Sequence, residues 1–169
     1  MTNEPPELLL GEWACLGILC QGPAHGFAVA ARLRPTGDIG RVWTMSRPLT
    51  YRALDQLVAK HCVRAVGEEP GLAGGNRTIL APTRLGRSRF RTWVVRPVAH
   101  LRDLRSELLL KLVLADALGV AIGPLVAAQR SAVAELAAAL GDPDPSDVVA
   151  LWRHESAQAA ARFLARLDG

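Results

Sequence analysis

The sequence predicts a mostly α-helical protein that carries one small β-hairpin. Apolar residues recur at the three- and four-residue spacing of a helix face through most of the 169 residues. The exception lies between residues 63 and 80, where two short strand-like runs flank a segment rich in glycine and proline. Half of the residues are apolar, which is enough to bury a core in one domain or in two small ones.

The chain begins with three expected helices. Four residues share one face of the first: Leu9, Trp13, Leu16 and Cys20. A second helix is expected over residues 25–34, and a third from an N-cap at Ser46 to about residue 60. One face of the third helix is expected to enter the core, with Thr50, Tyr51, Leu54, Leu57 and Val58. The opposite face is expected to point outwards, with Pro48, Leu49, Arg52, Gln56 and Ala59.

A β-hairpin follows the third helix. Its expected strands are Val63–Val66 and Arg77–Leu80, and its flexible tip lies in the segment from Glu68 to Asn76. Three helices followed by a hairpin is the order of a winged helix-turn-helix. In that fold the third helix enters the major groove of DNA and the hairpin lies along the DNA backbone.

The rest of the chain predicts further helices, over residues 84–95, Leu101–Leu118, Pro124–Leu140 and, with Ser146 as its cap, Asp147–Leu167. The helix over Leu101–Leu118 is apolar on more than one face, which favours burial against a second copy of the chain. The expected dimerisation residues are Leu9, Leu101, Leu104, Leu108, Leu112 and Ala115. We therefore expect a DNA-binding domain over residues 7–92 and a helical dimerisation and effector domain over residues 93–169.

The distribution of charge agrees with that division. Residues 1–92 contain 12 basic and 7 acidic residues, whereas residues 93–169 contain 8 and 9, within a net charge of +4. The positive half is expected to meet a polyanion, double-stranded DNA. Arg52 and Gln56 are the candidates for reading base edges. Arg47 and Thr50 are expected to hold phosphate after the Ser46 cap, Arg77 to contact DNA from the hairpin, and Tyr51 either to contact the backbone or to serve as a core ring.

Several other classes of protein are disfavoured. The three cysteines form no CxxC pair, and no histidine stands at ligand spacing, so no metal or cofactor is expected and the cysteines are interpreted as core residues. No catalytic motif is assembled, so the protein is not expected to be an enzyme. No apolar run is long enough to cross a membrane, and the acidic start lacks the features of an export signal, so a cytoplasmic protein is expected.

Five separated stretches resemble the PadR family of bacterial transcriptional regulators. They are Gly22–Phe27, Ser46–Leu57, Pro97–Leu112, Leu151–Glu155 and Arg162–Leu164. The resemblance implies a winged helix-turn-helix with an enlarged C-terminal dimerisation region. It also implies a small aromatic or hydrophobic effector near the dimer interface, for which Trp13, Trp93 and Trp152 are the candidate contacts. Two features depart from the family: Phe27 replaces a common tyrosine, and the hairpin tip over residues 71–76 carries no basic residue.

The sequence thus favours a homodimeric repressor that binds a near-palindromic operator. A winged helix that binds protein without sequence-specific DNA binding is the main alternative, because a fold does not fix a function. A DNA-binding regulator from another winged-helix family is a second alternative. The operator, the regulated genes and the effector are not predicted.

Overall fold

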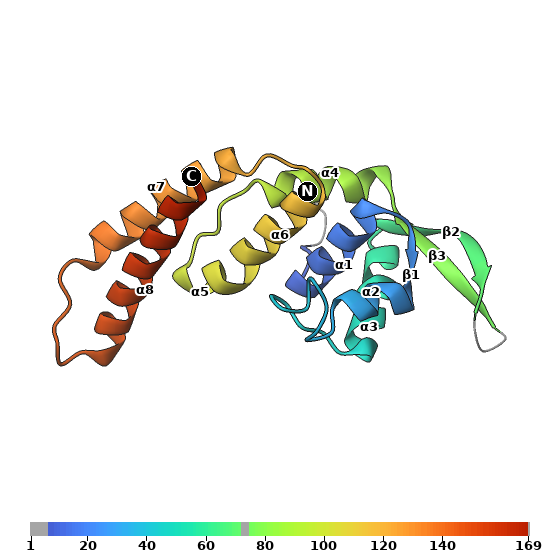
Figure 1. The fold of residues 1–169 in the computed structure, drawn as a ribbon, viewed down its shortest axis with the longest axis horizontal. Coiled ribbons are helices and arrows are strands. Elements are labelled where there is room, and N and C mark those ends of the chain that lie inside the picture. The colour runs from blue at the N-terminus through green and yellow to red at the C-terminus, as the bar shows by residue number, and fades with distance from the viewer. Residues whose placement is uncertain (1–6, 72–74, 169) are drawn as a thin grey trace, which may run out of the picture. The chain divides into compact units, whose positions relative to one another are not determined.

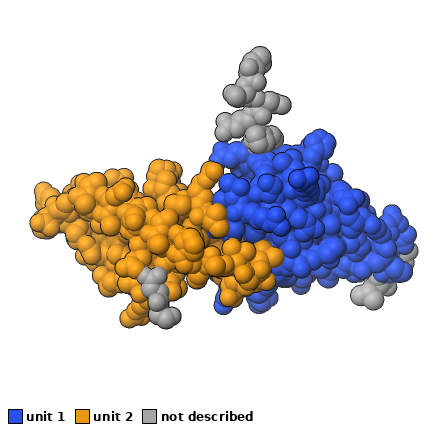
Figure 2. All heavy atoms as spheres, turned by 90° about the horizontal axis from the view of Figure 1, so that it is seen from above, with its two compact units in different colours: residues 1–94 blue, residues 95–169 orange. Residues whose placement is uncertain are grey.

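The computed structural model describes residues 7–71 and 75–168. It divides into two compact units, one ending at Val94 and the other beginning at Val95, which Figure 2 shows in blue and orange. The division lies two residues after the expected domain boundary. Each unit is described below by itself.

The first unit is a winged helix-turn-helix (Figure 1). Its elements are α1 (Leu10–Gln21), β1 (Ala24–His25), α2 (Gly26–Arg32), α3 (Arg47–Ala59), β2 (Val63–Pro70), β3 (Asn76–Pro82) and α4 (Arg84–Val94). The three strands form an antiparallel sheet in the order β1-β3-β2. The predicted mostly helical fold with a small hairpin is confirmed, and the short strand β1 adds to it.

Helix α1 forms the centre of this unit and packs against α2, α3, α4 and β3. It buries a charged group, because Glu12 is only 2% exposed. The Lys60 ammonium, at the end of α3, donates to the Glu12 Oε1 and Oε2 atoms at 3.0 and 2.8 Å. Glu12 Oε2 also accepts the Leu9 N–H at 2.9 Å. This buried ion pair fixes the end of α3 to the start of α1.

Helix α3 begins as predicted, because Ser46 Oγ accepts a hydrogen bond from the Leu49 N–H and Pro48 lies in the first turn. Its buried face is narrower than predicted. Tyr51 and Val58 are 38% and 42% exposed, whereas Ala53 is buried. At 100° per residue the buried face is centred on Thr50 and Leu57, with Ala53 at one edge and Tyr51 and Val58 beyond the other, so the face is turned towards Ala53.

The hairpin is longer than predicted. Residues 68–70 pair with residues 76–78, and a register shift between Ala65 and Gly67 marks a bulge. The glycine and proline residues of this stretch predict a turn, so the longer strands were not expected. Pro70 can nevertheless belong to β2, because β2 is an edge strand and an edge strand tolerates proline. The predicted tip includes residues 72–74, which lie outside the described residues.

The second unit consists of helices. Helix α5 (Leu101–Asp103), a π-helical turn η1 (Leu104–Leu108) and α6 (Leu109–Ala117) replace the single predicted helix, and α7 (Gly123–Leu140), α8 (Val148–Ala165) and a 3₁₀ turn η2 (Arg166–Asp168) follow. The core of the unit is formed by Val98, Leu108, Leu125, Val126, Val133 and Leu164. Asp147, not Ser146, caps α8, because its carboxylate accepts the N–H groups of residues 149 and 150 at 3.0 Å. Ser146 instead donates to Asp144.

Within the part of the chain that the structure describes, no helix combines the length and the apolar character needed to cross a membrane.

Candidate nucleic-acid interface

The outward face of α3 carries polar side chains that are free to reach a ligand. Arg52 and Gln56 are exposed and four residues apart, so they lie one turn from each other on the helix. Leu49 precedes them on the same face and is 53% exposed. The buried residues of α3 hold this face outwards, because Leu54 and Leu57 are 2% and 0% exposed.

Three arginines surround the Phe27 ring beside the start of α3. The guanidinium carbons of Arg34, Arg47 and Arg77 lie 5.6, 5.4 and 5.5 Å from the centre of the ring. These are cation–π distances. We call these four residues the Phe27 cluster.

Each arginine of the Phe27 cluster comes from a different part of the unit. Arg34 follows the end of α2, Arg47 is the first residue of α3, and Arg77 lies on β3. None of the three forms an ion pair with a carboxylate among the described residues. Because like charges held close together repel each other, the cluster is a place where an anion would be stabilised.

His25 connects the Phe27 cluster to the hairpin. Its Nδ1 atom accepts the Ala28 N–H at 3.0 Å and so caps α2. Its Nε2 atom lies 3.0 Å from Glu69 Oε1 on β2 and 3.4 Å from Arg77 Nη1 on β3. A ring with its proton on Nε2 donates to Glu69 while Nδ1 accepts, so the side chain joins α2 to β2; in this tautomer Nε2 cannot accept a hydrogen bond from Arg77.

Thr50 is not available to a phosphate. It is 0% exposed, and its hydroxyl donates to the Ser46 carbonyl at 3.0 Å. Of the two roles that the sequence left open for Tyr51, the structure shows that of a ring partly packed in the unit. A Cβ atom at Gly26 would lie only 2.8 Å from the Tyr51 ring, so the ring packs on α2, while its remaining surface is exposed and faces the Arg47 guanidinium at 5.7 Å.

Arg34 and His25 were not predicted as site residues, and Phe27 stood out in the sequence only as a departure from the family. No local pattern identifies them, since the residues of the cluster meet only after α2, α3 and β3 pack together. The excess of basic residues in the first half of the chain was the available signal.

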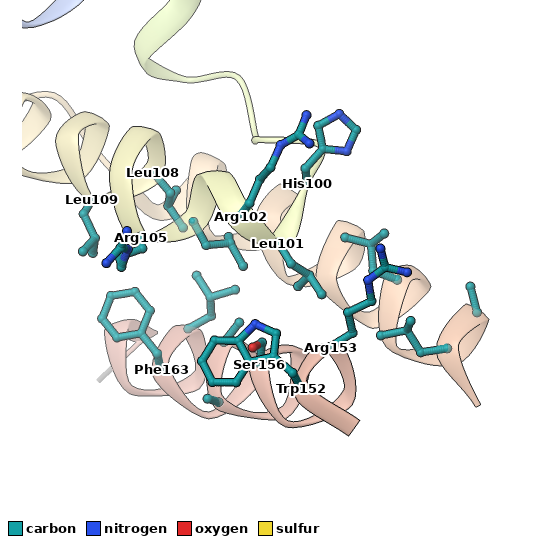
Figure 3. Close-up of a pocket in the computed structure, with 17 residues that line it drawn as sticks. His100, Leu101, Arg102, Arg105, Leu108, Leu109, Trp152, Arg153, Ser156 and Phe163 are labelled. Carbon is teal, nitrogen blue, oxygen red and sulfur yellow. The ribbon is translucent and has the colours of Figure 1, made fainter. Parts of the chain in front are cut away.

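The second unit contains an apolar pocket with a volume of about 1080 Å³. Figure 3 shows Trp152 and Phe163 of α8 beside the helical segment that carries Leu101 and Leu108. Leu101, Leu104 and Leu108 all line the pocket, whereas Leu112 packs against the core of the unit. Leu108 and Ala115 are each 1% exposed, and Leu9 of the first unit is 71% exposed.

The three candidate effector tryptophans have different environments. Trp13 and Trp93 stack on each other, with ring centres 4.7 Å apart and an interplanar angle of 6°. Trp93 is also buried. Trp152 is 72% exposed and lines the apolar pocket. Trp152 is therefore the one of the three whose ring is open to a ligand.

Cys15 and Cys20 have little thiolate character. Burial raises the pKa of Cys15 to about 12 and that of Cys20 to about 11, although Arg87 and Arg91 lower the latter. Cys15 and Cys62 are buried, and Cys20 is half-buried. Among the described residues, no group of three or more His, Cys, Asp or Glu side chains is placed to hold a metal ion.

No protein-family model and no curated protein matches the chain. The solved structures that are similar include Bacillus subtilis PadR in complex with operator DNA, with 14% identity and a TM-score of 0.49, covering 92% of this chain and 96% of that chain. Bacillus subtilis PadR is similar with 15% identity and a TM-score of 0.44, covering 94% of this chain and 92% of that chain. Both of these similar structures are of Bacillus subtilis PadR.

Proposed function

We propose that this protein is a DNA-binding transcriptional regulator that places α3 in the major groove. The observation that carries the proposal is the Phe27 cluster, in which three guanidinium groups from separate elements converge beside the first residue of α3. No carboxylate among the described residues forms an ion pair with these guanidinium groups. The phosphate backbone of DNA supplies the missing negative charge.

In this proposal one set of residues binds the DNA backbone and another set contacts the bases. The Phe27 cluster and the N-terminal end of the α3 dipole bind backbone phosphates, which fixes the position of the helix. The exposed Arg52 and Gln56 then face base edges, because an arginine pairs with guanine and a glutamine with adenine through two hydrogen bonds each. Ser46 caps α3, and the Tyr51 ring makes a cation–π contact with the Arg47 guanidinium.

The experiment that tests the proposal is the salt dependence of binding to duplex DNA. Fluorescence anisotropy is measured with a random duplex and with a duplex selected in vitro for binding. We expect steep salt dependence for the unchanged protein and a slope about three units shallower in R34Q/R47Q/R77Q, since each phosphate contact contributes about 0.9 to the slope.

The variant R102Q/R162Q/R166Q removes the same charge from exposed positions of the second unit and is the matched control. It should bind DNA nearly as the unchanged protein does. Salt-independent binding, or an equal loss in both variants, would contradict the proposal. The first of these outcomes would favour a winged helix that binds protein instead.

We further propose that the regulator is a homodimer that represses transcription from a near-palindromic operator. Helix α8 supports the dimer, because five of its large apolar residues are exposed: Val148 at 75%, Val149 at 55%, Leu151 at 38%, Trp152 at 72% and Phe163 at 38%. A single winged helix reads only a few base pairs, so two-fold pairing provides the needed specificity.

Sedimentation should show a dimer at micromolar concentration, and a reporter gene behind the selected duplex should be less active when the protein is present. A monomer would contradict the dimer.

The apolar pocket beside Trp152 suits a small aromatic or hydrophobic effector that releases DNA. Its lining is mostly aliphatic and aromatic, as in most ligand sites of this kind. Candidate phenolic compounds should quench tryptophan fluorescence in the unchanged protein and much less in W152F. A broad panel that leaves the fluorescence unchanged would contradict the effector.

A further inference from the structure

A second positive site lies in the first unit, away from the Phe27 cluster. It is a pocket with a volume of about 480 Å³ between the start of β2 and the outward face of α4. Its lining includes Arg64, Thr83, Arg84, Arg87, Ser88 and Arg91. We call it the four-arginine pocket. Figure 1 shows α4 and α3 at opposite edges of the first unit, and the pocket shares no residue with the Phe27 cluster.

Among the described residues, the four guanidinium groups of this pocket have no acidic partner. Arg84, Arg87 and Arg91 are spaced by three and four residues, so they form one stripe along α4, and Arg64 lies beside them on β2. No acidic residue lines the pocket, and none of the four forms an ion pair with a described carboxylate. Like charges at this spacing destabilise a helix, so a bound anion would reduce the repulsion between these arginines.

The backbone holds the two sides of the pocket together tightly. A Cβ atom at Gly86 would lie 2.0 Å from the Cys62 carbonyl oxygen, so only glycine allows α4 to approach the start of β2 this closely. Thr83 completes the junction, because its hydroxyl donates to the His61 carbonyl at 2.7 Å and accepts the Gly86 N–H at 3.0 Å. The part of β2 that carries Arg64 is therefore fixed beside α4 before any ligand binds, which lowers the cost of binding.

The lining defines the chemistry of the ligand. The pocket contains guanidinium and hydroxyl groups but no aromatic ring on which a base or another flat group could stack. Guanidinium groups pair with phosphate oxygens through two parallel hydrogen bonds, and four of them match an anion with several charges close together. A pocket of 480 Å³ has room for a few phosphate groups and is too small to contain a duplex.

We propose that the four-arginine pocket binds a compact oligophosphate, either free or as the phosphate chain of a small molecule. Binding joins α4 to the hairpin, and so provides the DNA-binding unit with a second ligand that is separate from DNA. The proposal does not depend on the function assigned to α3, because the two sites use different residues.

The test uses inorganic triphosphate as the probe and the full chain as the protein. Thermal unfolding and titration calorimetry are carried out with triphosphate, pyrophosphate, and sodium chloride at the same ionic strength. We expect both phosphates to raise the unfolding midpoint above that in sodium chloride. Binding of triphosphate should weaken at least about tenfold in R87Q/R91Q, since a hydrogen bond to a charged group is worth 1.5 kcal/mol or more.

The variant R162Q/R166Q is the matched control, because it also removes two exposed arginines four residues apart, on and just after α8. It should bind triphosphate as the unchanged protein does. Both variants change only exposed side chains, and far-UV circular dichroism checks that they fold.

Three outcomes would overturn the proposal: equal stabilisation by sodium chloride, unchanged triphosphate binding in R87Q/R91Q, or an equal loss in R162Q/R166Q. Duplex DNA binding by R87Q/R91Q is measured in parallel. A loss of duplex binding in that variant, without any specific triphosphate binding to the unchanged protein, would assign the pocket to the DNA backbone. Failure of α3 to bind DNA would instead appear in R34Q/R47Q/R77Q and would leave the triphosphate result unaffected.

Discussion

The two units bury apolar cores of their own and concentrate different groups at their surfaces. The first unit exposes arginines, both in the Phe27 cluster and in the four-arginine pocket. The second unit exposes large apolar side chains along α8, including Val148 at 75% and Trp152 at 72%. Clustered positive charge attracts anionic partners, and exposed apolar area indicates an apolar one.

Both units nevertheless contain a well-compensated lysine in their interior. Lys60 donates to Glu12 in the first unit, and Lys111, which is 1% exposed, donates to Glu107 at 2.7 Å and to the Arg96 carbonyl at 2.7 Å in the second. Burial lowers the pKa of Lys111, while Glu107 opposes that shift. The protein therefore pairs its buried lysines internally, whereas the arginines of the Phe27 cluster and of the four-arginine pocket have no ion pair with a described carboxylate.

The largest predicted effect is a loss of stability when the buried ion pair between Lys60 and Glu12 is broken. Lys60→Met leaves the Glu12 carboxylate buried without its counter-charge, and we expect the free energy of unfolding to fall by about 3–5 kcal/mol. Urea unfolding monitored by circular dichroism measures the loss. The double variant E12Q/K60M should recover much of it, because the buried charge is then absent. An equally unstable double variant would show that the packing of these side chains, rather than their charge, holds α3 on α1.

The next effect concerns the apolar surface of the second unit. Trp152→Asp places a charge in the exposed apolar area of α8 and should weaken the dimer by about 2 kcal/mol or more, or roughly thirtyfold in its dissociation constant. Sedimentation equilibrium measures that constant. Gln158→Asp, at an exposed position on the same helix outside the apolar pocket, is the control and should leave it nearly unchanged. A dimer that tolerates Trp152→Asp would place the interface elsewhere.

The architecture of both units was predictable because it depends on local patterns. The apolar spacing, the Ser46 cap and the turn residues after α1 all act within a few residues of each other, and the structure contains the corresponding elements. The wrongly predicted cap of α8 also has a local physical cause. Asp147 caps α8 in place of Ser146, since its carboxylate reaches two N–H groups while Ser146 is bonded to Asp144.

The sites were less predictable because they form between elements. Arg34, Arg47 and Arg77 come within reach of one ring only through the packing of α2, α3 and β3. Thr50 was expected to hold phosphate from its place in the first turns of α3, yet its hydroxyl is used by the Ser46 carbonyl and its side chain is buried. A helical wheel identifies the outward face but not the width of the buried one.

A smaller effect separates base contacts from backbone contacts within the first unit. Arg52→Ala removes an exposed side chain that we place at a base edge, so binding to the selected duplex should weaken by about 1–3 kcal/mol while binding to random DNA changes little. Competition anisotropy with the two duplexes measures the difference. An equal loss on both would assign Arg52 to the backbone.

The smallest effect is that of a single phosphate contact. Arg47 faces both Phe27 at 5.4 Å and Tyr51 at 5.7 Å, so its guanidinium is already oriented and needs little ordering when it binds. Arg47→Ala should therefore weaken binding similarly on selected and random duplexes and reduce the salt slope by about one unit. Arg41→Ala, at an exposed position outside the Phe27 cluster, is the control and should leave the slope unchanged. A sequence-dependent loss in Arg47→Ala would mean that the two rings aim this guanidinium at a base, and the division between the cluster and the outward face of α3 would then be wrong.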